Sequence, residues 1–124
     1  MQLNQQQTEQ FDELGYIYLP DVFSTSEVEL LRDEATKIFA LDREEVVREN
    51  DGRTARTAFA AQHYNEAYRR LGRHPRLLGP VMQLLDGDVY MHQYKINAKA
   101  GVNGDVWKRP QGYGTRARDN CKTG

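Results

Sequence analysis

Apolar side chains recur every three or four positions over Ser24–Phe39, which is the period of an α-helix. The stripe consists of Val28, Leu31, Ala35 and Ile38. Charged residues fill the other faces, so the stripe is typical of a helix that packs on a core. Ser24 and Ser26 each stand three residues before a glutamate, and both therefore match the capping-box pattern of a helix start.

Three further segments predict helices from their apolar spacing and their boundary residues. Glu9–Leu14 follows Thr8, a candidate N-cap, and precedes Gly15, which suits a helix end. Asn65–Leu71 ends in the same way at Gly72. Pro75–Leu85 is rich in leucine and begins with a proline, a residue favoured in the first turn.

Shorter β-type segments separate these helices. Glu45–Arg48 and Thr54–Phe59 flank Asn50-Asp51-Gly52. Asp-Gly favours the positive φ of a tight turn, so we expect a hairpin or an exposed loop here. Tyr16–Leu19 predicts a short strand that ends at Pro20. Val89–Ala98 predicts a longer strand. Helices followed by a few strands indicate an α+β fold whose sheet has only begun when the sequence ends, so we expect a truncated domain.

Composition supports a single globular unit. The chain has 124 residues, 39% hydrophobic and 28% charged, enough for one small domain. No apolar run approaches the ~20 residues that cross a bilayer, and the first residues lack a signal-peptide pattern. Cys121 is the only cysteine, which excludes an internal disulfide. We expect a cytoplasmic protein without membrane association, and the oligomeric state stays open.

Charge is distributed unevenly along the chain. Met1–Asp51 carries 4 Lys/Arg and 13 Asp/Glu, whereas Gly52–Gly124 carries 13 Lys/Arg and 5 Asp/Glu. A basic half can bind nucleic acid or a small anion, or it can simply neutralise the acidic half. The basic residues are dispersed and lack interleaved aromatic residues, which favours neutralisation over nucleic-acid binding.

Candidate chemistry lies on the strand predicted at Val89–Ala98. Gln93, Lys95, Asn97 and Lys99 alternate onto one face. Amides beside ammonium groups suit a small anion such as a carboxylate, although a solvated sheet face has the same pattern. On the other face we expect His92 to be a packed core histidine. His74 is expected at a helix start and His63 near a loop, and no pair of histidines has metal-ligand spacing.

The segment His92–Lys99, followed by Gly104–Trp107, Gln111 and Tyr113–Thr115, resembles the phytanoyl-CoA dioxygenase family. These are non-haem Fe(II)/2-oxoglutarate oxygenases, and the similarity leans toward the branch that contains ectoine hydroxylase. The resemblance covers nearly the whole chain. It implies that residues 1–124 are the N-terminal part of a single domain, with N-terminal helices and the first strands of a double-stranded β-helix, or jelly roll.

The resemblance also implies roles for individual residues. Lys99 matches a lysine that contacts 2-oxoglutarate, Asn97 is a weaker cofactor-binding candidate, and Gln93 matches a residue associated with the substrate. The family's iron ligands are a His-x-Asp pair and a distal histidine. Pro110 and Gly112 occupy the positions of that pair, and neither side chain offers a donor.

These observations predict a fragment or degraded member of the family that binds no iron and lacks catalytic residues. Departures from the family pattern crowd into the last residues, from Lys108 onward, as expected of a degraded gene end. The parent enzyme would hydroxylate a small-molecule substrate. One alternative is a metal-free module that binds a small anion like 2-oxoglutarate through Gln93 and Lys99, and nucleic-acid binding ranks last.

Overall fold

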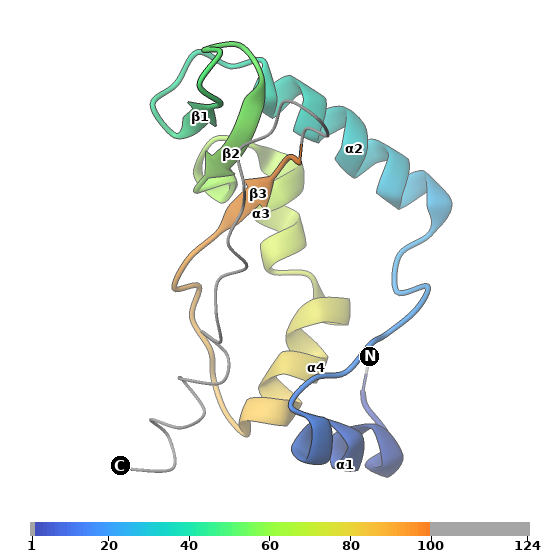
Figure 1. The fold of residues 1–124 in the computed structure, drawn as a ribbon. Helices are drawn as coiled ribbons and strands as arrows, with labels where there is room; N and C mark the ends of the chain where they lie inside the picture. Colours follow the sequence, from blue (N-terminus) through green and yellow to red (C-terminus); the bar gives the residue numbers. More distant parts are fainter. Residues whose placement is uncertain (1, 100–124) are drawn as a thin grey trace, which may run out of the picture.

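A computed structural model describes residues 2–99 of the chain. Its helices are α1 (Gln5–Leu14), α2 (Thr25–Phe39), η1 (a 3₁₀-helix, Ala61–His63), α3 (Glu66–Gly72) and α4 (Pro75–Leu85), and its strands are β1 (Val46–Arg48), β2 (Ala55–Phe59) and β3 (Lys95–Asn97). The strands lie beside α3 and the C-terminal end of α2, whereas α4 and α1 lie at the other end of the molecule (Figure 1). The predicted α+β class is confirmed. No helix within residues 2–99 has the length and apolar character needed to cross a membrane.

Helix α1 begins earlier than the sequence predicted. Its N-cap is Asn4, whose side chain accepts from the Gln7 backbone N–H at 2.8 Å, while the Gln7 side chain accepts from the Asn4 N–H at 2.9 Å. Thr8 lies inside the helix, and its hydroxyl donates to the Gln5 carbonyl. The prediction of Thr8 as N-cap was wrong because an asparagine and a glutamine form the same reciprocal cap four residues earlier. Gly15 ends the helix at φ 80°, as expected.

Helix α2 resolves the choice between its two candidate caps. The Ser24 hydroxyl accepts from the Glu27 N–H, and the Glu27 carboxylate accepts from the Ser24 N–H, so Ser24 is the N-cap and Ser26 lies within the first turn. The predicted stripe faces the core at its C-terminal end, where Ile38 is only 1% exposed. Val28, at the other end of the stripe, is exposed.

The three strands form one antiparallel sheet in the order β1-β2-β3. The predicted hairpin joins β1 to β2, and Gly52 adopts φ 71° in its loop. The Asp51 carboxylate accepts from the backbone N–H groups of Arg53 and Thr54 and from the Thr54 hydroxyl. These bonds, led by the Thr54 hydroxyl, lower the pKa of Asp51 to about 2.

Two strand predictions need correction. Tyr16–Leu19 forms no strand and leaves Tyr18 79% exposed. The strand predicted at Val89–Ala98 contracts to β3, and His92, expected in the core, is exposed. The physical reason is the length of its partner: β2 ends at Phe59, and Ala60 then turns the chain away at φ 55°. Alternation in the sequence cannot reveal that the pairing strand has ended.

The core lies between the sheet, α2 and α3, and consists of Ile38, Val46, Ala58, Ala61 and Tyr68, with Tyr94 and Ile96 packed against it. Two tyrosine hydroxyls bond to backbone carbonyls across these elements, and we call this pair of hydrogen bonds the tyrosine relay. The Tyr68 hydroxyl donates to the Leu31 carbonyl at 2.8 Å, and the Tyr94 hydroxyl donates to the Tyr68 carbonyl at 3.0 Å. Burial, with a smaller contribution from Tyr68, raises the pKa of Tyr94 to about 12, so this phenol remains a donor at neutral pH. The relay ties β3 to both helices.

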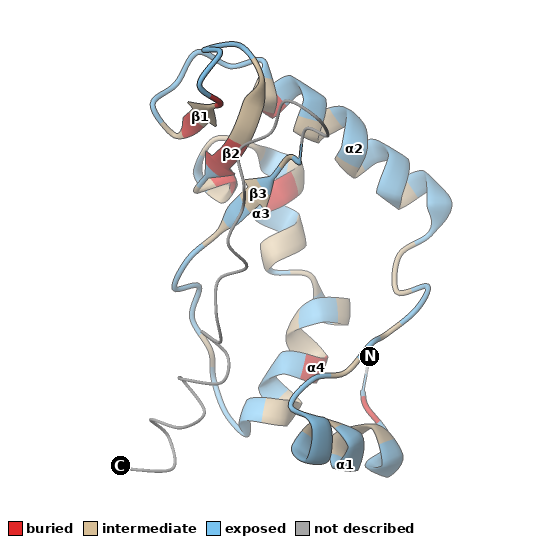
Figure 2. Cartoon of the chain, viewed as in Figure 1, coloured by how far each residue is buried: buried red, intermediate tan, exposed pale blue. Residues whose placement is uncertain are grey.

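The other end of the molecule, formed by α1 and α4, has few buried residues (Figure 2). We call this region the outer half, and the sheet with η1, α3 and the C-terminal end of α2 the core half. Side-chain bonds attach the outer half: Gln83 accepts from the Leu3 N–H at 2.7 Å and donates to the Leu3 carbonyl at 2.9 Å. Arg76 forms an ion pair with Glu27 and donates to the Val22 carbonyl at 2.8 Å, which fixes α4 to the start of α2.

Candidate ligand-binding face of the sheet

Of the four residues of the predicted polar face, Lys95 and Asn97 lie on one face of the sheet, whereas Gln93 and Lys99 lie outside β3. Ala58 and its partner Ile96 contact the core, so their strand neighbours project to the opposite side. There, Thr57 pairs with Asn97, and Phe59 pairs with Lys95. A cavity of about 200 Å³ opens on the sheet, lined by Val47, Arg56, Thr57, Phe59, Lys95 and Asn97. Apolar side chains beside amide and cationic groups suit a small polar ligand.

Asn97 is held in place by Thr57. The Thr57 hydroxyl donates to Asn97 Oδ1 at 3.1 Å, and Thr57 is only 4% exposed. Because its oxygen is engaged, Asn97 presents its amide nitrogen as a hydrogen-bond donor. The sequence pointed to Asn97 but missed Thr57. Thr57 is identified only by the register in which β2 pairs with β3, since it lies 40 residues before Asn97. The alternation of residues along one strand does not reveal that register.

Lys99 and Gln93 lie on either side of Asn97, and both are exposed. The Ala98 N–H donates to the Arg56 carbonyl at 2.9 Å, so the chain continues along β2 as far as Ala98. Lys99 follows Asn97 by two residues, a separation of at most about 7 Å along an extended chain, and Gln93 precedes Asn97 by four residues, at most about 13 Å. Neither residue lies within β3.

The described residues do not provide an iron site. Within residues 2–99, no three His, Cys, Asp or Glu side chains gather closely enough to hold a metal ion. His74 caps α4, since its Nδ1 accepts from the Arg76 N–H at 3.1 Å, as expected of a histidine at a helix start. Pro110 and Gly112, which the resemblance places at the family's ligand positions, lie outside the described residues. A proline and a glycine side chain offer no donor atom for Fe(II).

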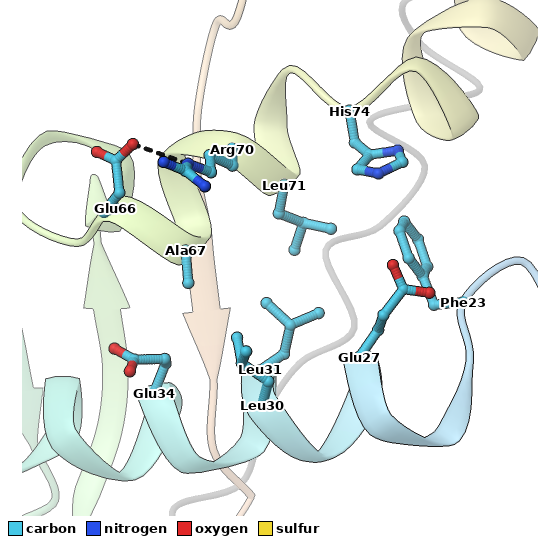
Figure 3. A pocket seen from close by; sticks show the side chains of 10 residues that line it. All are labelled: Phe23, Glu27, Leu30, Leu31, Glu34, Glu66, Ala67, Arg70, Leu71 and His74. Carbon is cyan, nitrogen blue, oxygen red and sulfur yellow. Dashed lines mark hydrogen bonds and ion pairs between the residues drawn. The ribbon is translucent and has the colours of Figure 1, made fainter.

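A separate groove of about 470 Å³ lies between α2 and α3 (Figure 3). Leu30, Leu31 and Leu71 form its floor. The carboxylates at its rim are already paired: Glu27 with Arg76, Glu34 with Lys37, and Glu66 with Arg69 and Arg70. The hydrogen bond from Arg76 is the main cause that lowers the pKa of Glu27 to about 2. With its charges satisfied internally, this groove has little to offer a polar substrate.

A family model matches residues 11–116, nearly the whole chain, and its description is phytanoyl-CoA dioxygenase (PhyH). The chain belongs to the phytanoyl-CoA dioxygenase family. The matched region includes all of β3 and the residues that flank it. The expectation from the motifs around His92–Lys99 is therefore confirmed at the level of the family.

The curated relatives that the chain resembles are named as a dioxygenase and a hydroxylase. The chain is 34% identical over 106 residues to ectoine dioxygenase of Halomonas elongata, covering 82% of this chain and 32% of that protein. It is 36% identical over 93 residues to L-proline trans-4-hydroxylase of Streptomyces griseoviridis, covering 75% and 35% respectively. The chain thus spans about a third of the length of the curated relatives it matches.

Solved structures of a phytanoyl-CoA dioxygenase relative share the fold. EctD from S. alaskensis with 2-oxoglutarate and 5-hydroxyectoine gives a TM-score of 0.75 at 33% identity, over 82% of this chain and 38% of that one. EctD from the same organism with bound Fe gives 0.78 at 32% identity, over 86% and 39%. The helices and antiparallel strands described above thus resemble a part of EctD, which has a jelly-roll fold, as predicted.

Proposed function

We propose that this chain is the N-terminal part of a single Fe(II)/2-oxoglutarate-dependent hydroxylase domain and that it carries the face that receives 2-oxoglutarate. The observation that carries the proposal is the exposure of Asn97, at the end of β3, and of Lys99, two residues further along the chain, inside the region matched by the family. A relative with the same fold was solved with 2-oxoglutarate, which supports this choice of anion.

Charge and geometry support separate roles for these residues. The Lys99 ammonium suits the carboxylate of 2-oxoglutarate distant from the reacting end, through a charge-assisted hydrogen bond. Asn97, with its oxygen held by Thr57, donates its amide N–H to the same anion. Bound Fe(II) supplies the family's oxidising chemistry with O₂, but the ligand positions of this chain hold Pro110 and Gly112. We therefore expect residues 1–124 to bind no iron and to be inactive by themselves.

Gln93 is proposed as a substrate contact. Gln93 precedes Asn97 by four residues, at most about 13 Å along an extended chain, which allows it to contact a molecule beside the 2-oxoglutarate. Ectoine and L-proline, the compounds in the names of two relatives, are both small cyclic carboxylic acids. We propose a substrate of this class for the complete domain, hydroxylated at a ring carbon.

Calorimetry with 2-oxoglutarate tests the cofactor-binding face directly. We expect the chain to bind the anion and Lys99→Ala to weaken binding about tenfold, the effect of losing one charge-assisted bond of roughly 1.4 kcal/mol. Lys37→Ala is the matched control, because Lys37 is an exposed lysine on α2 far along the chain from the sheet face. Equal binding by wild type and Lys99→Ala would refute the assignment of Lys99.

A second measurement tests the expected loss of catalysis. The purified chain is incubated with Fe(II), 2-oxoglutarate and either ectoine or L-proline, and bound iron and succinate are measured. We expect neither stoichiometric iron nor succinate above background, because the family's ligand positions lack donors. Substrate-dependent succinate formation by this chain would overturn the proposed inactivity while leaving the family assignment intact.

A further inference from the structure

Two aspartates within residues 2–99 are followed directly by glycine, at Asp51-Gly52 and at Asp86-Gly87. Such a pair can rearrange without an enzyme, because glycine has no side chain to hinder attack by its own backbone nitrogen. That nitrogen attacks Cγ of the preceding aspartate: an N–Cγ bond forms, the Cγ–OH bond breaks, and the N–H proton leaves with the hydroxyl as water. Addition of water to the resulting five-membered succinimide gives back aspartate or gives isoaspartate, in which the main chain runs through Cγ.

The hairpin loop holds Asp51-Gly52 in a conformation that opposes this reaction. Both carboxylate oxygens of Asp51 accept hydrogen bonds, from the backbone N–H groups of Arg53 and Thr54 at 2.8 Å and from the Thr54 hydroxyl. The attacking group is also engaged, since the Gly52 N–H donates to the Glu49 carbonyl at 2.9 Å. The bonds to the carboxylate lower the pKa of Asp51 to about 2, so very little of it carries the hydroxyl that must leave. Cyclisation therefore requires the loop to open.

The pair Asp86-Gly87 lacks these restraints. Asp86 is the C-cap of α4 at φ 53° and ψ 56°, a left-handed conformation that is less favourable for aspartate than for glycine. Its carboxylate takes part in no hydrogen bond or ion pair with any other residue of 2–99. The Gly87 N–H donates to the Met82 carbonyl at 3.2 Å, an acceptor that it shares with the Asp86 N–H. Since the last turn of α4 contains no buried residue, its fraying frees both reacting groups at little cost.

We propose that Asp86-Gly87 is a site of spontaneous isoaspartate formation in the folded chain, whereas the hairpin loop shields Asp51-Gly52. Isoaspartate lengthens the main chain by a methylene group and leaves the carboxylate on Cα. The N–H groups of residues 86 and 87 can then no longer both reach the Met82 carbonyl, so the product removes the cap that ends α4. The modification thus alters the joint between α4 and the segment that leads into β3.

Peptide mapping of the aged, folded chain tests this assignment. The chain is kept at neutral pH, digested with trypsin and resolved by chromatography, where isoaspartate changes the retention of a peptide but not its mass. Trypsin separates the relevant sites: Asp51 in residues 49–53, Asp86 in residues 77–95, and Asn103-Gly104, a further succinimide-forming sequence outside the described residues, in residues 100–108. We expect at least about tenfold more isoaspartate at Asp86 than at Asp51, the ratio produced by a difference of about 1.4 kcal/mol in the free energy of local opening.

Three variants identify the cause of the difference. Asp86→Glu keeps the charge but requires a six-membered ring, which closes far more slowly, so the isomerised peptide should disappear. Thr54→Val removes the hydroxyl bond to Asp51 and should raise isoaspartate there severalfold while the yield at Asp86 stays the same. Thr36→Val is the matched control, because the Thr36 hydroxyl donates to the Arg32 carbonyl within α2, and it should change neither site.

Concentrated urea provides the reference state, since it removes the fold and leaves only the local sequences to differ. The rates at Asp51 and Asp86 should then become similar. The proposal is overturned if Asp51 isomerises as fast as Asp86 in the folded chain, if no isoaspartate forms at Asp86, or if the difference between the two sites persists unchanged in urea. None of these measurements uses 2-oxoglutarate or iron, so their outcome is separate from that of the Lys99 assignment.

Discussion

The core half and the outer half of this chain use different means of stability. In the core half, side chains from the sheet, α2 and α3 meet in a common interior, where Ile38 and Ala58 are almost inaccessible to water. In the outer half, α1 and α4 are attached by a few specific bonds from Gln83 and Arg76 while large apolar residues remain exposed. Helices therefore need not be wrapped around a core to be well formed, since caps and side-chain bonds also stabilise them.

Truncation of matched aliphatic residues in the two halves should give the largest contrast. Ile38→Ala removes a side chain that is 1% exposed, and we expect a loss of about 2–5 kcal/mol in the free energy of unfolding. Leu85→Ala, at a position 64% exposed, should cost less than about 1 kcal/mol. Urea unfolding of both variants measures the difference, and similar losses would show that the two halves share one core.

Removal of the Gln83 side chain should loosen the outer half selectively. Gln83→Ala deletes both bonds to Leu3, worth about 1–2 kcal/mol together. We expect faster hydrogen exchange of the α1 amides, with little change at Ala58. Gln10→Ala, an exposed glutamine on α1, provides the control. If hydrogen exchange at Ala58 accelerated as much as at the α1 amides, the whole chain would be opening together. The two halves would then not open independently.

The tyrosine relay offers a finer test within the core half. Tyr94→Phe keeps the ring but removes the hydroxyl that donates to the Tyr68 carbonyl, so unfolding should become easier by about 0.5–1.5 kcal/mol. Tyr90→Phe, at a residue 84% exposed in the outer region, should change stability by no more than a few tenths of a kcal/mol. Thermal unfolding measures the melting temperature of both variants. Equal shifts would show that the Tyr94 hydroxyl contributes nothing specific to the stability of the core half.

The smallest effect concerns the ion pair that joins α4 of the outer half to the start of α2. The folded pKa of Glu27 is about 2, below its ordinary value of 4.5, chiefly because Arg76 bonds its carboxylate. The stabilisation is therefore fully present above pH 4.5 and is lost as the pH falls through about 2. Arg76→Gln should make the fall in melting temperature over this window shallower. Arg53→Gln is the control, since Arg53 lies beside Asp51, a second carboxylate with a folded pKa of about 2. It should barely alter the pH dependence of the melting temperature, because the Thr54 hydroxyl is the main cause of the low pKa of Asp51.

Local signals in the sequence predicted most of the secondary structure. The capping box at Ser24, the glycine after Leu14, the Asp51-Gly52 turn and the proline at the start of α4 each act through a few neighbouring residues. Such signals can be read from one stretch of chain. The error at Thr8 arose in the same range, because an Asn–Gln pair closes the cap as effectively as a Ser–Glu pair.

Pairing between distant segments could not be predicted in the same way. The alternation over Val89–Ala98 has the period of a strand, yet only Lys95–Asn97 forms one, because Ala60 ends β2 with a left-handed turn. The same limit applies to the candidate site. Asn97, Lys99 and Gln93 were selected by their resemblance to family positions, whereas Thr57 became visible only through the register of β2 with β3.

The tyrosine relay also has a consequence for the order of folding. The hairpin of β1 and β2 closes a short loop, so it can form early and quickly. Strand β3 must instead find Thr57 across 40 residues of chain, and Tyr94 can bond only to a Tyr68 carbonyl that α3 has already placed. We therefore expect β3, and with it the face that carries Asn97 and Lys99, to be the last element to acquire its native register.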